Sequence, residues 1–385
     1  MDFIIWLSAI GVAFLVTVVA IRYLAMMADR LGLMDRPGGR KRHARPVPVV
    51  GGAGVMCGLA AAVAMLGPNL AAYWPIALGL VLLALVGVAD DALHLGSSPK
   101  FVFQIIAAAL AVGYGGALVE TLGAFPDGRP LVLGALAVPF SMLAIVGFIN
   151  ALNMLDGVDG LAGGAALVML GGLAVAASLN GGGASLALAT LAIAAVMAFL
   201  VFNVRTPWQP RARVFLGDGG SLPLGLLVAW LAIEISQSPG GVLSPMALAW
   251  ILVVPVLDTV FVMLRRLLQG RSPFVGDRIH LHHILLRAGL RPGQVAVVLV
   301  GLIALLAAIG VNAALMGVSD TLLFTGLLAV ALVHGAAIWF PGRVIRVLRR
   351  GLRLSAQGDG SARLPERGPG QSSGYASSGG RGRLS

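Results

Sequence analysis

The chain has 385 residues, of which 58% are hydrophobic and only 11% are charged, and its formal net charge is +11. A soluble domain carries about 25% charged residues, so the composition excludes a water-soluble globular protein and indicates that lipid covers much of the surface. The lone cysteine, Cys57, excludes a disulfide framework.

Long apolar segments recur along the chain. A helix that crosses the hydrocarbon core of a membrane needs about 20 mostly apolar residues. The pattern predicts an all-α, polytopic integral membrane protein with about eleven transmembrane helices. The first segment lacks a basic n-region and is too long for a signal peptide, so it is counted as a span. The predicted spans are residues 3–21, 48–67, 71–89, 101–118, 131–149, 161–178, 184–203, 219–236, 244–264, 292–314 and 320–340.

The basic residues set the expected orientation, because Lys and Arg are retained on the cytoplasmic side. If the N-terminus lies outside, every Lys and Arg except Arg129 falls in a cytoplasmic segment. The predicted location is a bacterial-type inner (plasma) membrane, with the C-terminus in the cytoplasm. The positive charge is therefore a topology signal, and nucleic-acid binding is not expected. Residues 1–351 form the predicted membrane domain, whereas 352–385 are rich in Gly, Ser and Arg and are expected to form a disordered cytoplasmic tail.

Acidic and imidazole side chains gather at the cytoplasmic ends of these spans. Asp90 and Asp91 end the third span, a group of Asn and Asp residues follows the fifth, Asp218 precedes the eighth, and three histidines lie in the last large inner loop. Ionisable groups next to the membrane are costly and usually mark function. Structural roles are the alternatives: a solvated helix end for Asp90 and Asp91, and a helix cap for Asp218. Asp258 lies within a span, and the single histidines His94 and His334 are expected to be structural.

The chemistry of these residue types narrows the function. Asn153, Asp156 and Asp159 are spaced by three, so a helical turn would place them on one side. Carboxylate and amide oxygens suit Mg²⁺ or Mn²⁺, and nearby Arg and Lys suit phosphate. A zinc site at the three histidines is the alternative, but neither a Cys beside them nor an HExxH pattern supports it. The residues alone predict a metal-dependent phosphotransferase with a lipid acceptor and an active site on the cytoplasmic face.

Seven motifs, in order over about residues 1–340, extend this interpretation. The sequence resembles the polyprenyl-phosphate N-acetylhexosamine-1-phosphate transferases. The resemblance implies that a polyprenyl phosphate attacks the β-phosphate of a UDP-sugar, that UMP leaves, and that Mg²⁺, or Mn²⁺, assists. The motifs are DRPGGRKRHARPVPVVGG (35–52), GVADDALHLGSSPKFVFQ (87–104), NALNMLDGVDGLAGG (150–164), FNVRTP (202–207), VFLGDGGSLPLG (214–225), PVLDTVFVMLRR (255–266) and SPFVGDRIHLHHILLRAGL (272–290).

The resemblance also implies roles for individual residues, in three groups. The implied catalytic residues are Asp90, Asp91, Asp156, Asp159 and His282. The implied substrate-binding residues are Lys100, Asn203, Phe215, Arg265, Arg278, His280 and His283. The implied metal ligands are Asn153 and Asp218.

One departure from the family pattern bears on the sugar. The branch that makes peptidoglycan precursors usually carries consecutive histidines in the last loop, whereas Leu281 interrupts them in this chain. This form resembles the branch that uses small UDP-N-acetylhexosamines, which favours UDP-GlcNAc and the start of a lipid-linked surface polysaccharide such as O-antigen. UDP-GalNAc or a deoxy N-acetyl sugar is the alternative. The implied partners are the UDP-sugar, polyprenyl phosphate and the membrane, and a homodimer stays open. A transporter or flippase is the rival class, with Asp258 as its best support.

Overall fold

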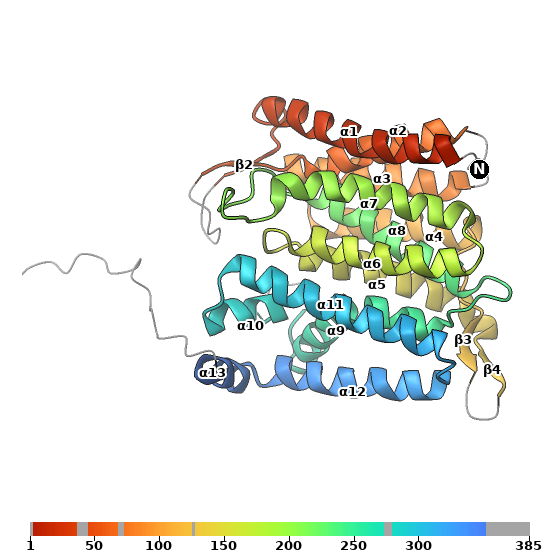
Figure 1. The fold of residues 1–385 in the computed structure, drawn as a ribbon. Coiled ribbons are helices and arrows are strands. Elements are labelled where there is room, and N and C mark those ends of the chain that lie inside the picture. The colour runs from red at the N-terminus through yellow and green to blue at the C-terminus, as the bar shows by residue number, and fades with distance from the viewer. Residues whose placement is uncertain (1–2, 37–44, 68–72, 125–127, 273–278, 352–385) are drawn as a thin grey trace, which may run out of the picture.

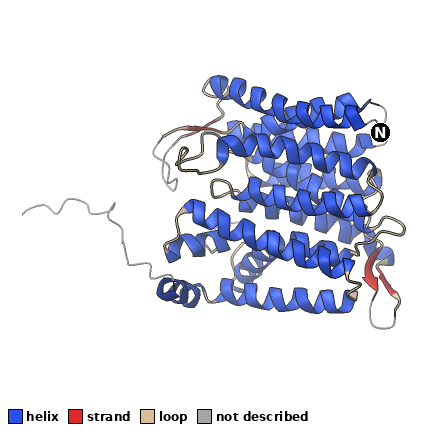
Figure 2. Cartoon of the chain, in the orientation of Figure 1, coloured by secondary structure: helices blue, strands red, loops and turns tan. Residues whose placement is uncertain are grey.

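A computed structural model describes residues 3–36, 45–67, 73–124, 128–272 and 279–351 as a bundle of long helices that run side by side (Figure 1). The all-α prediction is confirmed, because strands within the described residues are limited to two short antiparallel pairs (Figure 2). The pairs are β1 (Met34–Asp35) with β2 (Val47–Pro48), and β3 (Thr121–Ala124) with β4 (Pro130–Val132). The predicted tail, 352–385, lies outside the described residues.

Each predicted span corresponds to a helix. Nine helices in the described part are long and apolar enough to cross a membrane, and α2 and α4 are shorter apolar helices. α2 begins at Gly51 rather than at 48 because Val47 and Pro48 pair with β1. The helices are α1 (Phe3–Met27), α2 (Gly51–Leu66), α3 (Trp74–Leu93), α4 (Ser97–Gly113), α5 (Ala137–Leu155), α6 (Leu161–Leu179), α7 (Gly183–Asn203), α8 (Asp218–Ser236), α9 (Pro245–Leu268), α10 (Leu281–Ala288), α11 (Pro292–Leu315), α12 (Asp320–Trp339) and α13 (Pro341–Gly351).

The two ends of the bundle differ. The N-terminus and the β3–β4 hairpin lie at one end, whereas β2, α10 and α13 lie at the other (Figure 1). α10 and α13 share a small apolar cluster with α9 and α12, made of Val262, Ile284, Ala288, Ile338 and Ile345. Arg349 of α13 also donates a hydrogen bond to the carbonyl of Arg287 in α10, at 2.8 Å. The short helices are thus attached to the same end of the bundle.

Glycine contacts join α2, α3 and α8 at that end. α8 is buried along almost its whole length, whereas α1, α3 and α12 expose apolar faces of the kind that lipid covers. Gly52 of α2 meets the backbone of Gly220 in α8, and Gly87 of α3 meets the carbonyl of Asp218, with no space for a Cβ atom at either position. Because small residues let helix backbones approach closely, the first turn of α8 lies directly against the end of α3.

Candidate active site among the helix ends

The backbone before α8 is held in place by main-chain hydrogen bonds. The N–H of Phe215 donates to the carbonyl of Pro48 at 2.9 Å, and the N–H of Gly51 donates to the carbonyl of Phe215 at 2.9 Å. Gly217 then adopts φ 72°, a left-handed conformation that suits glycine. Any Cβ atom there would also collide with Val49 and with the carboxylate of Asp91. The glycines around Asp218 therefore fix where α8 begins.

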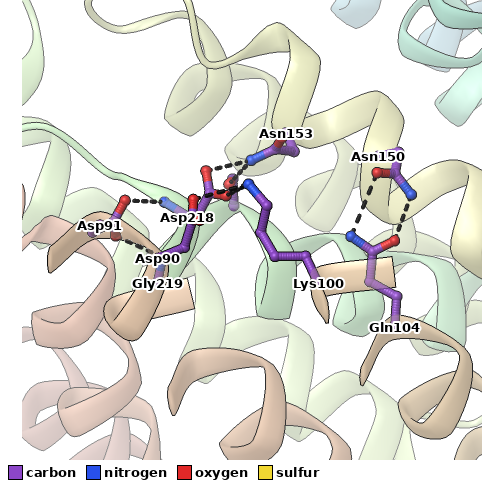
Figure 3. A network of polar contacts seen from close by, with 9 residues as sticks. Asp90, Asp91, Lys100, Gln104, Asn150, Asn153, Asp218 and Gly219 are labelled. Carbon is purple, nitrogen blue, oxygen red and sulfur yellow. Dashed lines mark hydrogen bonds and ion pairs between the residues drawn. The ribbon is translucent and has the colours of Figure 1, made fainter. Parts of the chain in front are cut away.

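Asp91 caps α8 from a different helix. Its Oδ1 accepts a hydrogen bond from the N–H of Asp218 and its Oδ2 accepts one from the N–H of Gly219, both at 3.0 Å (Figure 3). The first N–H groups of a helix have no partner within the helix, and the helix dipole favours an anion at this end. Asp91 satisfies both conditions and joins the end of α3 to the start of α8.

Lys100 lies at the centre of the polar network. Its Nζ donates to Oδ2 of Asp90 at 2.9 Å and to Oδ2 of Asp218 at 2.8 Å (Figure 3). Nδ2 of Asn153 donates to Oδ1 of Asp218 at 2.7 Å and to the hydroxyl of Ser221 at 2.9 Å. Residues from α3, α4, α5 and α8 thus meet at one point.

A cavity of about 790 Å³ opens beside this network. Eight of the residues singled out from the sequence lie close together on its wall. They are Asp90, Asp91, Asp156, Asp159, Asn203, Phe215 and Asp218, together with His283 from α10. The wall also contains Asp35, His94 and Arg287, to which the sequence analysis gave no site role. All three lie within matched motifs, which is the signal that could have identified them, although His94 was expected to be structural.

Two of the predicted residues on this wall also hold its loops together. Oδ2 of Asp159 accepts from Nε of Arg205 at 2.7 Å and from the N–H of Ala212 at 3.1 Å. The side chain of Asn203 accepts from the N–H of Gly160 at 2.7 Å and donates to the carbonyl of Val214 at 2.8 Å. These contacts tie the turn after α5 to the loop after α7, so both side chains shape the cavity.

The three histidines occupy different environments. His283 lies on the cavity wall. His282 is only 2% exposed, its Nδ1 has no hydrogen-bond partner among the described residues, and its Nε2 lies against Gly157. Burial, with His283 adjacent, lowers the pKa of His282 to about 3, so this ring is neutral at physiological pH. Nδ1 of His280 instead lies 2.8 Å from Oδ2 of Asp258, in α9.

The two predicted arginines are not placed on the described wall. Nη1 of Arg265 donates to the carbonyl of Ile338 at 3.1 Å, which attaches α9 to the end of α12. Arg278 lies outside the described residues. Their expected contacts with substrate stay predictions.

The carboxylates suit a hard divalent cation by their chemistry. The described residues contain no group of three or more His, Cys, Asp or Glu arranged to hold a metal ion, and Lys100 bridges Asp90 and Asp218. Oδ1 of Asp90, however, is buried without a hydrogen-bond partner in the described part of the chain. Burial and the charges of Asp218 and Asp91 raise the pKa of Asp156 to about 7. Crowded carboxylates of this kind are stabilised by a cation, so the donor set fits Mg²⁺ or Mn²⁺.

This bundle of apolar helices, with an acidic and basic cavity at one end, defines a multi-pass membrane protein whose polar site lies among its helix ends. Residues 73–236, which include α3 to α8, match the family model described as "Glycosyl transferase family 4". The chain belongs to this family, and within it to the polyprenyl-phosphate N-acetylhexosamine-1-phosphate transferases, as its relatives below show. The expectation drawn from the motifs is thereby confirmed.

The similar proteins cover almost the whole chain. It is 32% identical to the undecaprenyl-phosphate alpha-N-acetylglucosaminyl 1-phosphate transferase of Escherichia coli O157:H7, over 90% of this chain and 95% of the relative. Proteins of the same name from Salmonella typhi and Yersinia pestis are 33% and 31% identical. The Salmonella typhi match covers 90% of this chain and 95% of the relative, and the Yersinia pestis match covers 84% and 89%. The transporter alternative finds no support in these similarities.

Proposed function

We propose that the protein transfers N-acetylglucosamine 1-phosphate from UDP-GlcNAc to undecaprenyl phosphate. A phosphate oxygen of the lipid attacks the β-phosphorus of the UDP-sugar, and the bond between that phosphorus and the bridging oxygen breaks. UMP leaves with the bridging oxygen, and the product is a lipid-linked diphospho-sugar that begins a surface polysaccharide. The observation that carries the proposal is the cavity at the helix ends, where Lys100 joins Asp90 and Asp218, in a chain whose relatives bear this name.

The residues of the network favour this reaction through charge and position. A phosphate monoester is largely anionic near neutral pH because its second pKa is about 6, so the lipid phosphate needs little help from a base. The ammonium of Lys100, held on two carboxylates, offers positive charge beside the cavity. His283 and Arg287 on the wall contributed by α10 offer donors to a diphosphate. Phosphoryl transfer depends mainly on such positioning and charge neutralisation.

A divalent cation is part of the proposal. Asp218 and Asn153, with Asp90 and Asp156 nearby, would hold Mg²⁺ or Mn²⁺, and the ion would neutralise negative charge on the diphosphate and on the leaving UMP. Asp91 has a separate task, because both of its oxygens are used by backbone N–H groups of α8. It keeps Asp218 at the cavity.

The proposed reaction is tested with the purified protein in lipid nanodiscs that contain undecaprenyl phosphate. Release of labelled UMP from UDP-GlcNAc, its loss with EDTA and its recovery with Mg²⁺ or Mn²⁺ are the expected results. UDP-GalNAc and a deoxy N-acetyl sugar, supplied in the same assay, should react more slowly. If no UDP-sugar releases UMP in a well-folded preparation, the proposal is refuted.

The proposed orientation places the cavity end of the bundle in the cytoplasm of a bacterial inner membrane. The asymmetry of basic residues supports it, because Arg129 is the one basic residue that the proposed topology places outside. A reporter fused after Arg353 should report the cytoplasm, and one inserted in the 119–130 segment should report the periplasm. Equal signals from both reporters would contradict this orientation.

A further inference from the structure

A buried carboxylate in α9 has no task in the reaction as described. Asp258 is 3% exposed, it lies within a helix long and apolar enough to cross a membrane, and it is not on the cavity wall. A carboxylate at such a place is costly unless its oxygens are well satisfied. Its position therefore calls for an explanation.

Both oxygens of Asp258 are used, and both reach the loop that carries the histidines. Nδ1 of His280 lies 2.8 Å from Oδ2, and because a carboxylate only accepts, this nitrogen donates its proton. The backbone N–H of Leu281 donates to Oδ1 at 2.8 Å. Hydrogen bonds to an ionised acceptor are about twice as strong as neutral ones, so the loop is firmly attached to α9.

The contact with Leu281 replaces a helix cap. His280 occupies the N-cap position of α10, but its side chain makes no capping hydrogen bond. Asp258 accepts a hydrogen bond from one of the N–H groups that the start of a helix leaves unpaired. A negative charge at a helix N-terminus is also favoured by the helix dipole. Asp258 thus fixes where α10 begins, although it lies 23 residues earlier in the chain.

The three histidine rings form a contiguous cluster between Asp258 and the cavity, in which His280 and His282 are stacked and His283 is tilted by 48° against His282. The rings of His280 and His282 are stacked, with centroids 5.8 Å apart and an interplanar angle of 10°. The centroids of His282 and His283 are 4.1 Å apart. His283 lies on the cavity wall, whereas His280 does not. Because a packed interior transmits strain, a displacement of His280 would be passed through these ring contacts to His283.

α12 contributes to the same anchor. Nε2 of His334 lies 3.4 Å from Oδ1 of Asp258, and its ring stacks on Phe261 of α9. His334 is buried and distant from the cavity wall. Its Nε2 makes no hydrogen bond within the described residues, so His334 acts on the carboxylate through its close position alone.

We propose that Asp258, supported by His334, is a positioning residue of the transferase: it fixes α10 through His280 and Leu281 so that His283 faces the UDP-sugar. His280 is then the link between the carboxylate and the site rather than a contact with substrate. The inference rests on the proposed transfer reaction. It adds the means by which one wall of the cavity is held in place.

Two substitutions separate the two contacts of Asp258. Asp258→Asn keeps one carbonyl oxygen for Leu281 but turns an N–H group toward His280, and Asp258→Leu removes both contacts. The loss of a hydrogen bond to a charged group should raise the KM for UDP-GlcNAc about 10-fold in Asp258→Asn, with a larger rise in Asp258→Leu. The KM for undecaprenyl phosphate should be unchanged. A variant that merely reduced the folded fraction would lower the apparent kcat and leave both KM values intact, and that pattern would overturn the proposal.

A matched control is available one residue away. The hydroxyl of Thr259 is buried on the same helix and has no hydrogen-bond partner among the described residues. Thr259→Val should therefore behave like the wild type in both KM values. His334→Gln, which keeps a donor for the carboxylate, should retain a lower KM for UDP-GlcNAc than His334→Leu. Equal KM values for the two His334 variants would remove His334 from the anchor.

A double substitution tests the link through His280. If Asp258 acts through this ring, Asp258→Asn combined with His280→Gln should raise the KM for UDP-GlcNAc no more than the larger single effect. If the two effects multiply, the residues act independently and the proposal fails.

Hydrogen exchange of the α10 amides, 281–288, provides a readout that needs no turnover. Exchange should be faster in Asp258→Leu than in Thr259→Val or the wild type, because α10 has lost its anchor. Equal exchange would overturn the anchoring role even if the enzyme transfers the sugar. Absence of UMP release by the wild type would instead refute the proposed function, and the exchange result would still decide whether Asp258 anchors α10.

Discussion

Asp218→Asn is the most direct test of the network, because the change conserves shape and removes only charge and one acceptor. The two oxygens of Asp218 receive different donors, Lys100 on Oδ2 and Asn153 on Oδ1. An asparagine offers one oxygen and one NH₂ group, so one of these donors must face another donor. A residue that merely begins a helix would tolerate the change, since Asn caps about as well as Asp.

The size of the effect follows from the contact with Lys100. A hydrogen bond to a charged group contributes about 1.5–3 kcal/mol. The side chains of Lys100 and Asp218 are 21% and 19% exposed, so solvent screens the pair only in part. If the lost charge also weakens the hold on the divalent cation, the barrier to transfer should rise by about 2.7 kcal/mol. This increase corresponds to a rate at least about 100-fold lower.

The assay measures UMP release at saturating UDP-GlcNAc and undecaprenyl phosphate over a series of Mg²⁺ concentrations. Asp29→Asn is the matched control, because Asp29 also pairs with a basic residue, Arg36 at 2.8 Å, but its side chain is 75% exposed. Exposed pairs contribute little, so this variant should keep its rate. Near-normal turnover by Asp218→Asn at limiting Mg²⁺ would show that the reasoning is wrong and that Asp218 serves only as the first residue of α8.

Three further outcomes are expected. Gly52→Ala should lower the melting temperature and the rate, because a methyl group has no space against Gly220; Gly147→Ala, which meets open space, is the control, and equal melting temperatures would contradict the close contact. His282→Phe should make the free energy of unfolding less dependent on pH. The pKa of His282 is about 3 in the folded protein and about 6.5 in the unfolded chain. The stability that the neutral ring contributes is therefore complete above pH 6.5 and falls by about 1.4 kcal/mol per pH unit below it. Unchanged acid sensitivity, measured by thermal unfolding at pH 7.5 and 5.5, would argue against that. Truncation after residue 351 should leave activity within about tenfold, because the composition of 352–385 cannot support a packed core; a larger loss in a well-expressed truncation would assign the tail a role.

The fold was predictable because length and apolarity decide where a membrane helix forms. The pattern of apolar runs located α1 to α9, α11 and α12, and it failed mainly at boundaries such as Gly51, where β2 shortens the helix. The short helices α10 and α13 were not predicted as separate elements, because each is stabilised by contacts with the other and with α9 and α12. Local sequence does not contain that information.

The site was predictable in its residue types but not in its contacts. The acidic pair that ends the third span pointed to Asp91, a glycine-flanked acid before the eighth span pointed to Asp218, and the structure places the two together. Their partnership spans 127 residues, and no local pattern states that Asp91 caps α8. The same limit applied to Asp258, which looked like support for a transporter until its contact with His280 was seen.

The glycine contacts among α2, α3 and α8 have a mechanical consequence. Where backbone meets backbone, as at Gly52 and Gly220, there is no side chain whose rotation could absorb a displacement. The wall of the cavity formed by α2, α3 and α8 is therefore rigid, and these three helices are expected to move only together. The wall that carries His283 is attached to its neighbours through side chains instead, by ring contacts and by the hydrogen bonds of Asp258. If the proposed UDP-sugar binds in this cavity, a bulkier sugar is expected to displace the histidine side rather than the side that holds the carboxylates.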